Sequence, residues 1–322
     1  MVEAVARGAR PQPPATPTPF HHVGLLYRDQ TEYRRAVTSF VRAGLAAGDP
    51  VLVAVPGARL DLLRAALSDV SDRVRFADMA RAGRNPGRIL PGVLLAFAAA
   101  HPGRRAWIVG EPIWPGRTEV EYPACVAHEA LINDAFAGRD AAILCPYDAD
   151  NLDHAALADA QHTHPTMLDG DGLRPSPAYL PSVAARALYN VPLPAAPPDA
   201  ATMSYHGEWE LAAVRRFVTA EAAATGLGAD RADDLAIAVN ELAANTVEHT
   251  GGAGRVRIWR EPGLLVCQIE DKGYLRDPLA GRVPPPPDTE GGRGLILANQ
   301  LCDLVRIHTG AEGTRIRLHI DR

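Results

Sequence analysis

The chain has 322 residues, of which 47% are hydrophobic, and a formal net charge of −5 at pH 7. Its length and apolar content predict a globular protein of about two domains. Charges of both signs are spread along the chain without a basic stripe that would neutralise a phosphate backbone. The composition therefore argues against direct binding of nucleic acid.

Residues 1–19 are rich in proline, alanine and threonine and nearly lack large apolar side chains. Such a segment cannot offset the entropy of ordering, so we predict a disordered tail. It has no apolar h-region, and the longest apolar run, Gly92 to Ala100, is far shorter than the roughly 20 residues of a membrane span. We therefore expect no membrane anchor.

The cysteines are far apart in the sequence, at Cys125, Cys145, Cys267 and Cys302. Three of them lie in strongly apolar runs, where reduced and buried thiols are the ordinary expectation. This use of cysteine is typical of a reducing compartment, and we predict a cytoplasmic protein.

From Phe20 onward, short apolar runs alternate with segments of helical periodicity. The runs Val51 to Val55, Trp107 to Val109 and Ala141 to Cys145 are typical of strands that are buried on both faces. We predict an α/β domain with a mostly parallel sheet over residues 20–174.

Repeated prolines over residues 175–203 break both helices and strand ladders, which predicts a semi-rigid linker. A second domain, residues 204–322, follows it. Its pattern predicts a helix closed by glycine, a second helix capped by Asp230, a hairpin that turns at Glu261 to Gly263, a third helix from Gly294 and two final strands.

The second of these helices contains NELAANTVEH, in which Glu241 and Asn245 lie four residues apart. Helical periodicity places both on one polar face. The opposite face carries Leu235, Val239, Leu242 and Thr246. By itself this pattern is that of an ordinary helix with a solvated side, and the same spacing occurs earlier, at Glu129 and Asn133.

Two later segments favour a nucleotide site. EDKG places Asp271 and Gly273 at the end of a predicted strand, where a carboxylate can accept a hydrogen bond from an exocyclic amine and a residue without Cβ lets a flat ring approach. In TEGGRGLILANQLCD, Gly291, Gly292 and Gly294 precede a helix and offer backbone amides to phosphate oxygens. Each segment alone is also compatible with an ordinary loop. Neither follows the earlier pair of the same spacing within its domain, so we do not assign that pair to the site.

The ordered set Glu-x-x-x-Asn, Asp-x-Gly and Gly-x-Gly-Leu resembles the N, G1 and G2 boxes of the GHKL ATPase superfamily, over roughly the last 120 residues. Within it, the chain is similar to RsbW-type anti-sigma factors, which are serine protein kinases acting on anti-sigma-factor antagonists. The resemblance implies an α+β, Bergerat-type ATP-binding domain, a two-layer α/β sandwich, with ATP and Mg²⁺ as cofactors. Its implied partners are a sigma factor and a STAS-type antagonist, and a homodimer is left open.

The resemblance also implies roles for the polar residues. Asn245 would hold Mg²⁺ against the triphosphate, Glu241 would be the base or orienting group for the attacking hydroxyl, and Asp271 would bind the adenine amine. These residue types suit the chemistry, because Mg²⁺ prefers oxygen ligands and phosphoryl transfer depends on positioning and charge neutralisation.

For the remaining positions, the resemblance implies that Gly273 flanks the adenine ring and that Gly292 and Gly294 border the phosphate lid. Thr314 matches a threonine that supports the adenine-binding aspartate. The chain departs from the pattern at Leu275, where the family usually has a second glycine, and the lid contains the stiff run Pro284 to Pro287. We therefore expect this departure to affect lid closure and catalytic rate more than nucleotide binding.

Two other functions stay open: a non-catalytic ATP-binding protein that sequesters a sigma factor, and a small-molecule sensor with a vestigial ATPase fold. A histidine kinase shares this ATP domain but needs a dimerising helical hairpin with a phosphoacceptor histidine upstream. The proline-rich segment at residues 175–203 leaves no room for such a hairpin.

The amino-terminal domain resembles the MEDS sensory domain over about Phe20 to Gln161. The motifs are FHHVGLLYRDQTEYRRAVTSFVRAGLAAGDPVLVAV, GEPIW, HEALINDAF and CPYD. The resemblance implies a KaiC/RecA-like α/β fold that senses a small, hydrocarbon-type ligand. After the strand Val51 to Val55, PGARLD occupies the position of a phosphate loop but lacks Gly-Lys-Ser/Thr, so we expect no second nucleotide site.

Glu111 follows a buried strand, at the edge where open α/β sheets bind ligands. Together with Trp114, Glu129 and Cys145 it is a candidate for lining a sensory pocket, and ordinary packing is the alternative for each. Several histidines and cysteines offer metal ligands: His21, His22, Cys125, His128, His162 and His164. Their spacing does not match a structural zinc motif, so the sequence does not predict a metal site in this domain.

Overall fold

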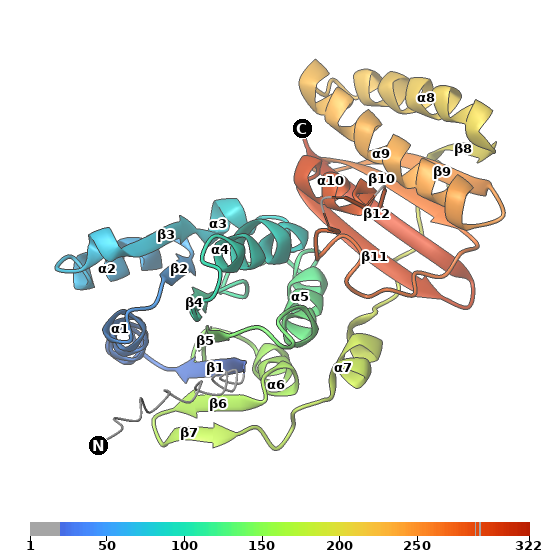
Figure 1. The fold of residues 1–322 in the computed structure, drawn as a ribbon. Coiled ribbons are helices and arrows are strands. Elements are labelled where there is room, and N and C mark those ends of the chain that lie inside the picture. Colours follow the sequence, from blue (N-terminus) through green and yellow to red (C-terminus); the bar gives the residue numbers. More distant parts are fainter. Residues whose placement is uncertain (1–19, 287, 290) are drawn as a thin grey trace, which may run out of the picture.

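The structure, a computed structural model, describes residues 20–322 except residues 287 and 290. The predicted tail at residues 1–19 lies outside the described residues. The described chain folds around two β-sheets, one after the other in sequence and each with its own helices (Figure 1). Within that part of the chain, no helix combines the length and the apolarity needed to cross a bilayer.

Sheet A belongs to the first module, residues 20–175. Its strands are β1 (His21–Tyr27), β2 (Val51–Val55), β3 (Val74–Asp78), β4 (Ala106–Gly110), β5 (Ala141–Asp148), β6 (Thr166–Asp169) and β7 (Gly172–Pro175). The spatial order is β3-β2-β4-β5-β1-β6-β7. Neighbouring strands are parallel except for the final β6–β7 hairpin. The predicted mostly parallel sheet is confirmed.

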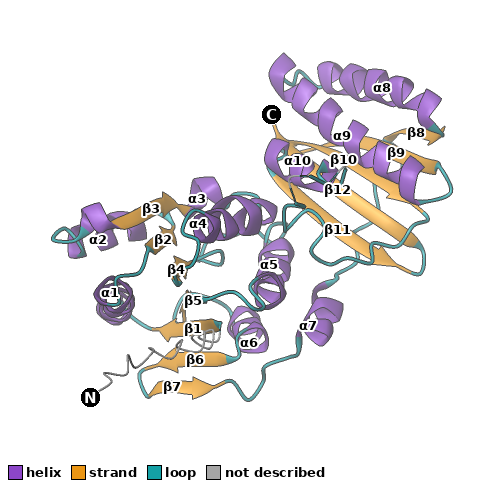
Figure 2. Ribbon diagram, viewed as in Figure 1, coloured by secondary structure: helices purple, strands orange, loops and turns teal. Residues whose placement is uncertain are grey.

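Helices cover both faces of sheet A, as Figure 2 shows. The helices of this module are α1 (Gln30–Ala46), α2 (Gly57–Ala66), α3 (Met79–Ala82), α4 (Leu95–Ala99), α5 (Tyr122–Ala135) and α6 (His154–Thr163), with a 3-10 turn η2 (Pro86–Arg88) before α4. In β2, Val51, Val53 and Val55 pack with α1 and α2, whereas Leu52 and Ala54 pack into the core beneath α4 and α5. The continuous apolar run is thus explained by burial on both faces.

The segment between the sheets contains more regular structure than its prolines predict. Between β7 and β8 (Ala201–His206), helix α7 (Ser182–Tyr189) packs against α5. The helix forms in a stretch without proline, between Pro181, which is its N-cap residue, and Pro192. Proline breaks a helix from within but is tolerated at its start, so the stretch can be helical.

Sheet B belongs to the second module, residues 201–321. Its strands are β8, β9 (Ala253–Glu261), β10 (Leu264–Asp271), β11 (Leu304–Gly310) and β12 (Gly313–Asp321). They are antiparallel in the order β11-β12-β10-β9-β8. The β9–β10 turn is at the predicted position, with Gly263 at a φ of 74° that favours glycine.

Three helices of this module pack on one face of sheet B: α8 (Leu211–Ala224), α9 (Ala229–His249) and α10 (Gly294–Leu301) (Figure 1). The predicted apolar face of α9 is buried as expected, at Leu235, Val239, Leu242 and Thr246. Its N-cap residue is Gly228, so Asp230 lies in the first turn and does not cap the helix as predicted.

The two modules meet at the carboxyl end of α10. The side chain of Asn85 donates to the Asn299 carbonyl at 2.9 Å, and Arg88 donates to the carbonyls of Asn299 and Cys302, each at 2.7 Å. The last carbonyls of a helix have no partner within the helix. Here side chains of the first module donate hydrogen bonds to these carbonyls, and these bonds attach α10 to the first module.

Candidate functional site

Helix α9 and the end of β10 are joined through Asp271. The Thr246 hydroxyl donates to Asp271 Oδ2 at 2.9 Å, and the Gly273 amide donates to Asp271 Oδ1 at 2.7 Å. Thr246 is the residue after Asn245 and is only 1% exposed. Each carboxylate oxygen accepts one of these bonds and has a further lone pair for a ligand donor. The carboxylate is therefore fixed in direction by two elements.

The role of Thr246 was not predicted, because helical periodicity placed this residue on the buried face of the helix. The predicted support for Asp271 was Thr314. In the structure, Thr314 pairs with Asp271 in strand register, but its hydroxyl donates to the Gly273 carbonyl at 3.0 Å. The sequence did contain one indication of this role, because Thr246 has a hydroxyl on the buried face of the helix and directly follows Asn245.

Glu241 and Asn245 lie against the start of α10. A Cβ added to Gly294 would be 3.0 Å from Asn245 Nδ2 and 3.4 Å from Glu241 Oε2. Gly294 is buried, whereas Glu241 and Asn245 are half-buried. The missing side chain lets the amino-terminal end of α10, where backbone amides point outward, come directly beside these two polar groups.

The predicted residues thus form two groups. Asn245 and Glu241 adjoin Gly294, and Asp271 adjoins Gly273 through the bond described above. A cavity of about 520 Å³ lies where the end of β8, the start of β9 and the end of β10 are side by side, and Asp271, but neither Asn245 nor Glu241, is among the described residues that line it. Gly292, at a φ of 73°, is exposed in the loop before α10.

The connecting segment, residues 274–293 apart from 287 and 290, lies between Gly273 and α10 and contacts both modules. Leu275, at the position of the second family glycine, packs on the core of the second module, and its amide donates to the Thr309 hydroxyl at 3.0 Å. Leu279 and Val283 instead pack against the core of the first module. The segment is therefore anchored at its start and middle by different modules.

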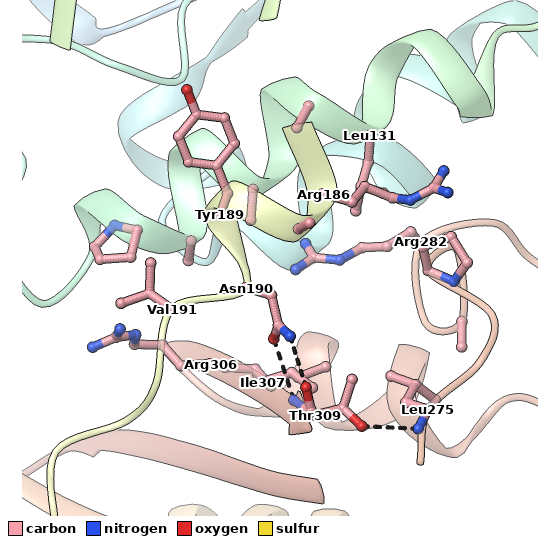
Figure 3. Close-up of a pocket in the computed structure, with 18 of the residues that line it drawn as sticks. Leu131, Arg186, Tyr189, Asn190, Val191, Leu275, Arg282, Arg306, Ile307 and Thr309 are labelled. Carbon is pink, nitrogen blue, oxygen red and sulfur yellow. Dashed lines mark hydrogen bonds between the residues drawn. The ribbon is translucent and has the colours of Figure 1, made fainter. Parts of the chain in front are cut away.

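A cavity of about 340 Å³ lies between the modules, where α5, α7, the connecting segment and β11 meet. Asn190 forms two hydrogen bonds with the Thr309 backbone across it, at 2.7 and 3.2 Å (Figure 3). Arg282 points into the cavity from the connecting segment, and burial lowers its pKa to about 10. Among the described residues, Arg282 Nη1 has no hydrogen-bond partner. The buried guanidinium stays charged at neutral pH and offers a donor to this space.

The four residues predicted to line a sensory pocket do not share one set of contacts. Glu111 is fully buried and pairs with Arg59 of α2, which also donates to Asp148 at 2.9 Å. Trp114 stacks under Arg117 instead, with 3.9 Å between the guanidinium carbon and the ring centroid. Arg59 comes from the PGARLD segment, so an ion cluster lies near the end of β2 where a phosphate loop would be.

Glu129 and Cys145, the other two, lie together with His22 and His164 in the interior of the first module. Glu129 Oε2 is 3.3 Å from His22 Nε2 and 3.4 Å from His164 Nε2. Burial lowers the pKa of His22 to about 4. The earlier Glu-x-x-x-Asn pair therefore belongs to a buried cluster, which histidine spacing did not reveal because its members come from four different elements.

Family models match both modules. Residues 21–165 match the MEDS family, described as the MEthanogen/methylotroph, DcmR Sensory domain, and residues 208–320 match the histidine kinase-like ATPase domain. No curated protein matches the chain. The chain is similar to a crystal structure of the RsbU and RsbW domains of a Mycobacterium tuberculosis protein, with 22% identity and a TM-score of 0.30. That similarity covers 39% of this chain and 33% of the other, so this chain spans about a third of that structure's length.

Proposed function

We propose that this chain, which joins a MEDS domain to a histidine kinase-like ATPase domain, is an ATP-dependent regulator of the anti-sigma kinase type. In this proposal Asp271 accepts a hydrogen bond from the adenine amine and Gly273 lies against the ring. Asn245 contributes an oxygen ligand to Mg²⁺, and the amides near Gly292 and Gly294 bind phosphate oxygens. Thr314 acts through the Gly273 carbonyl.

One observation carries the proposal. Thr246 bonds to Asp271 on one side of α9, while the neighbouring Asn245 contacts the start of α10 at Gly294. Segments that are far apart in the sequence thus meet along one turn of one helix. A carboxylate fixed in direction, an amide oxygen and a helix amino-terminus are the groups that an adenine nucleotide with its metal requires.

For the reaction, we assign Glu241 to accept the proton of an attacking serine or threonine hydroxyl. Bound Mg²⁺ would neutralise charge on the phosphate oxygens as the phosphoryl group transfers. Glu241 is one helical turn before Asn245, so a hydroxyl beside the terminal phosphate would meet both. The proposed substrate is an antagonist protein of the STAS type, and the proposed second partner is a sigma factor.

The MEDS domain is the proposed sensory input, with a small molecule as its ligand. The parallel sheet with helices on both faces supports the proposal that this domain is KaiC/RecA-like, as the sequence resemblance implies. The connecting segment supplies a contact between the two domains, because Leu279 and Val283 pack on the first module.

Nucleotide titration tests the binding assignment. We expect saturable binding of Mg·ATP to the full chain and at least tenfold weaker binding for Asn245→Ala. The matched control is Asn240→Ala on the same helix, where the side chain accepts a bond from Arg215 at 2.7 Å. Equal affinities for wild type and Asn245→Ala would remove Asn245 from the site.

The kinase assignment needs a separate assay with labelled ATP and a candidate antagonist. Glu241→Ala should abolish transfer while nucleotide binding persists, and Glu248→Ala, an exposed glutamate on the same helix, should have no effect. Transfer that is unchanged in Glu241→Ala would exclude Glu241 as the base.

A second candidate function, ATP-dependent sequestration without phosphoryl transfer, is favoured by the anchoring of Leu275. Its backbone bond to Thr309 and its packing on the core restrict the start of the segment that would close over the phosphates. Binding of a sigma factor in the presence of ATP, without label transfer to any antagonist, would select this function.

A further inference from the structure

The buried cluster in the first module brings four potential metal ligands to one point. His22 starts β1, Glu129 lies in α5, Cys145 lies in β5 and His164 is the C-cap residue of α6. Their nearest ligand atoms all lie within 4.8 Å of one another, and every one of these residues is buried. The cluster shares no residue with the proposed nucleotide site.

The outer nitrogens of both histidines are held by acceptors. His22 Nδ1 is 3.1 Å from Asn133 Oδ1, and the Asn133 amide nitrogen donates to the Thr163 carbonyl at 2.9 Å, which fixes the direction of the amide. His164 Nδ1 is 2.8 Å from the Ala160 carbonyl. An acceptor needs a donor, so both Nδ1 atoms carry hydrogen. In the neutral rings, both Nε2 atoms then present lone pairs to the centre of the cluster.

At the centre of the cluster, Cys145 Sγ contacts His22 Nε2 at 3.4 Å, and the atoms around this contact lack hydrogen bonds within the described part of the chain. Among the described residues, neither oxygen of Glu129 has a hydrogen-bond partner, and neither has His164 Nε2. A fully buried carboxylate without donors, facing nitrogen lone pairs, is strongly unfavourable in a dry interior. A cation at the centre would satisfy all of these atoms together.

Three of the six distances between the ligand atoms match a tetrahedral ion, and the other three are within 4.8 Å. Metal–nitrogen and metal–oxygen bonds of about 2.0–2.1 Å place neighbouring ligand atoms about 3.3–3.4 Å apart, and a metal–sulfur bond of about 2.3 Å lengthens the sulfur–nitrogen edge to about 3.5 Å. Glu129 Oε2 is 3.3 and 3.4 Å from the two Nε2 atoms, and Cys145 Sγ is 3.4 Å from His22 Nε2.

The surrounding fold is shaped for the cluster. Gly24 of β1 pairs with Cys145 of β5, and a Cβ at Gly24 would be 3.1 Å from the His164 ring. The absence of that side chain leaves room for the side chains of Met167 and His164 beside β1. Asn133, one turn after Glu129 on α5, positions the His22 ring in the way that outer hydrogen bonds orient metal-binding histidines.

From this geometry we propose that His22, Glu129, Cys145 and His164 bind one divalent transition-metal ion, with Zn²⁺ as the ion that fits the mixed nitrogen, oxygen and sulfur ligands. Four protein ligands make a closed site, which is typical of a structural role. The ion joins β1, β5, α5 and the end of α6. Each ligand binds as its deprotonated form, so the Cys145 thiol releases its proton on binding.

Metal analysis of the full chain, purified without a histidine tag from zinc-supplemented cells, tests the proposal. We expect about one zinc ion per chain in the wild type and at least tenfold less in Cys145→Ser and His164→Gln. Matched controls are Cys125→Ser, a buried thiol on α5, and His162→Gln on α6, which should keep the metal. Equal zinc in wild type and ligand variants would place the ion elsewhere and overturn the assignment.

Cobalt titration of chelator-stripped protein separates metal loss from misfolding. Wild type should develop both the visible bands of tetrahedral Co²⁺ and the near-ultraviolet thiolate band, and Cys145→Ser should lose the thiolate band. Asn133→Ala, which changes no ligand, should weaken metal affinity by about 10–100-fold. Stripped wild type that keeps its circular dichroism and binds neither Zn²⁺ nor Co²⁺ would instead identify an imidazolium–carboxylate network.

Discussion

Replacing Thr246 by valine tests whether α9 directs the carboxylate of Asp271. Valine keeps the shape of the side chain and removes the hydroxyl that donates to Asp271 Oδ2 at 2.9 Å. Thr246 is 1% exposed, so the substitution removes a bond at a position that water does not readily reach. The Gly273 amide still donates to the other oxygen, at 2.7 Å.

The expected cost follows from these contacts. A hydrogen bond to a charged group contributes about 1.5–3 kcal/mol. Asp271 is half-buried, and solvent can partly replace the lost donor. We therefore expect the lower part of that range, about 1.5–2 kcal/mol of unfolding free energy. If Asp271 also loses its direction, Mg·ATP affinity should fall about tenfold, since 1.4 kcal/mol is a factor of ten.

Urea unfolding and nucleotide titration measure the two effects. The matched control is Thr225→Val, because Thr225 is 7% exposed and its hydroxyl donates only to the nearby Ala222 carbonyl among the described contacts. The cost of Thr246→Val should also shrink in an Asp271→Ala background. If Thr246→Val costs no more than Thr225→Val and binds nucleotide normally, Thr246 does not direct Asp271.

Three further substitutions address other parts of the molecule. Gly294→Ala adds a Cβ 3.0 Å from Asn245 Nδ2, and this overpacking should lower the free energy of unfolding by about 1–3 kcal/mol and weaken nucleotide binding. A melting curve and a nucleotide affinity that both equal those of the wild type would contradict the close approach of Gly294 and Asn245. Burial lowers the pKa of His319 from 6.5 to about 4. As the pH falls from 6.5 to 4, this histidine is protonated in the unfolded chain but not in the folded chain, so the folded state loses stability over that range. His319→Gln should reduce this loss of stability by about 3 kcal/mol, measured by urea unfolding at pH 7 and pH 4. If wild type and His319→Gln lose the same stability between these two pH values, protonation of His319 is not the cause. Asn85→Ala removes a fully buried donor to the Asn299 carbonyl, which should lower the free energy of unfolding by about 1–3 kcal/mol and speed limited proteolysis between the modules. An unchanged rate of cleavage would indicate that this contact does not hold the modules together.

Local patterns in the sequence were sufficient for much of the fold. The apolar run at Val51 to Val55 predicted a strand buried on both faces, and glycine predicted the turn at Gly263. Helix α7 was missed because prolines on both sides suggested a semi-rigid linker without helices, although Ser182 to Tyr189 contain none. Periodicity and turn chemistry depend on neighbours in sequence, and these features were the ones predicted best.

The sites were less predictable because their contacts are not local. The bond between Thr246 and Asp271 joins residues of two elements, whereas helical periodicity alone places Thr246 in the core. Likewise, no spacing rule connects His22 with His164, since strand order brings β1 between β5 and β6. The departure at Leu275 was visible in the sequence, but its bond to Thr309 required the structure.

Helix α5 has one side in the histidine cluster and the other side in the wall between the modules. Glu129 and Asn133 lie on the first side, and Ala124, Ala127 and Leu131 line the cavity into which Arg282 points. Its fourteen residues make a helix about 20 Å long, and a closely packed helix transmits strain from one side to the other. A rotation of α5 caused by the histidine cluster on one side would therefore change the size of the cavity that Arg282 occupies on the other side.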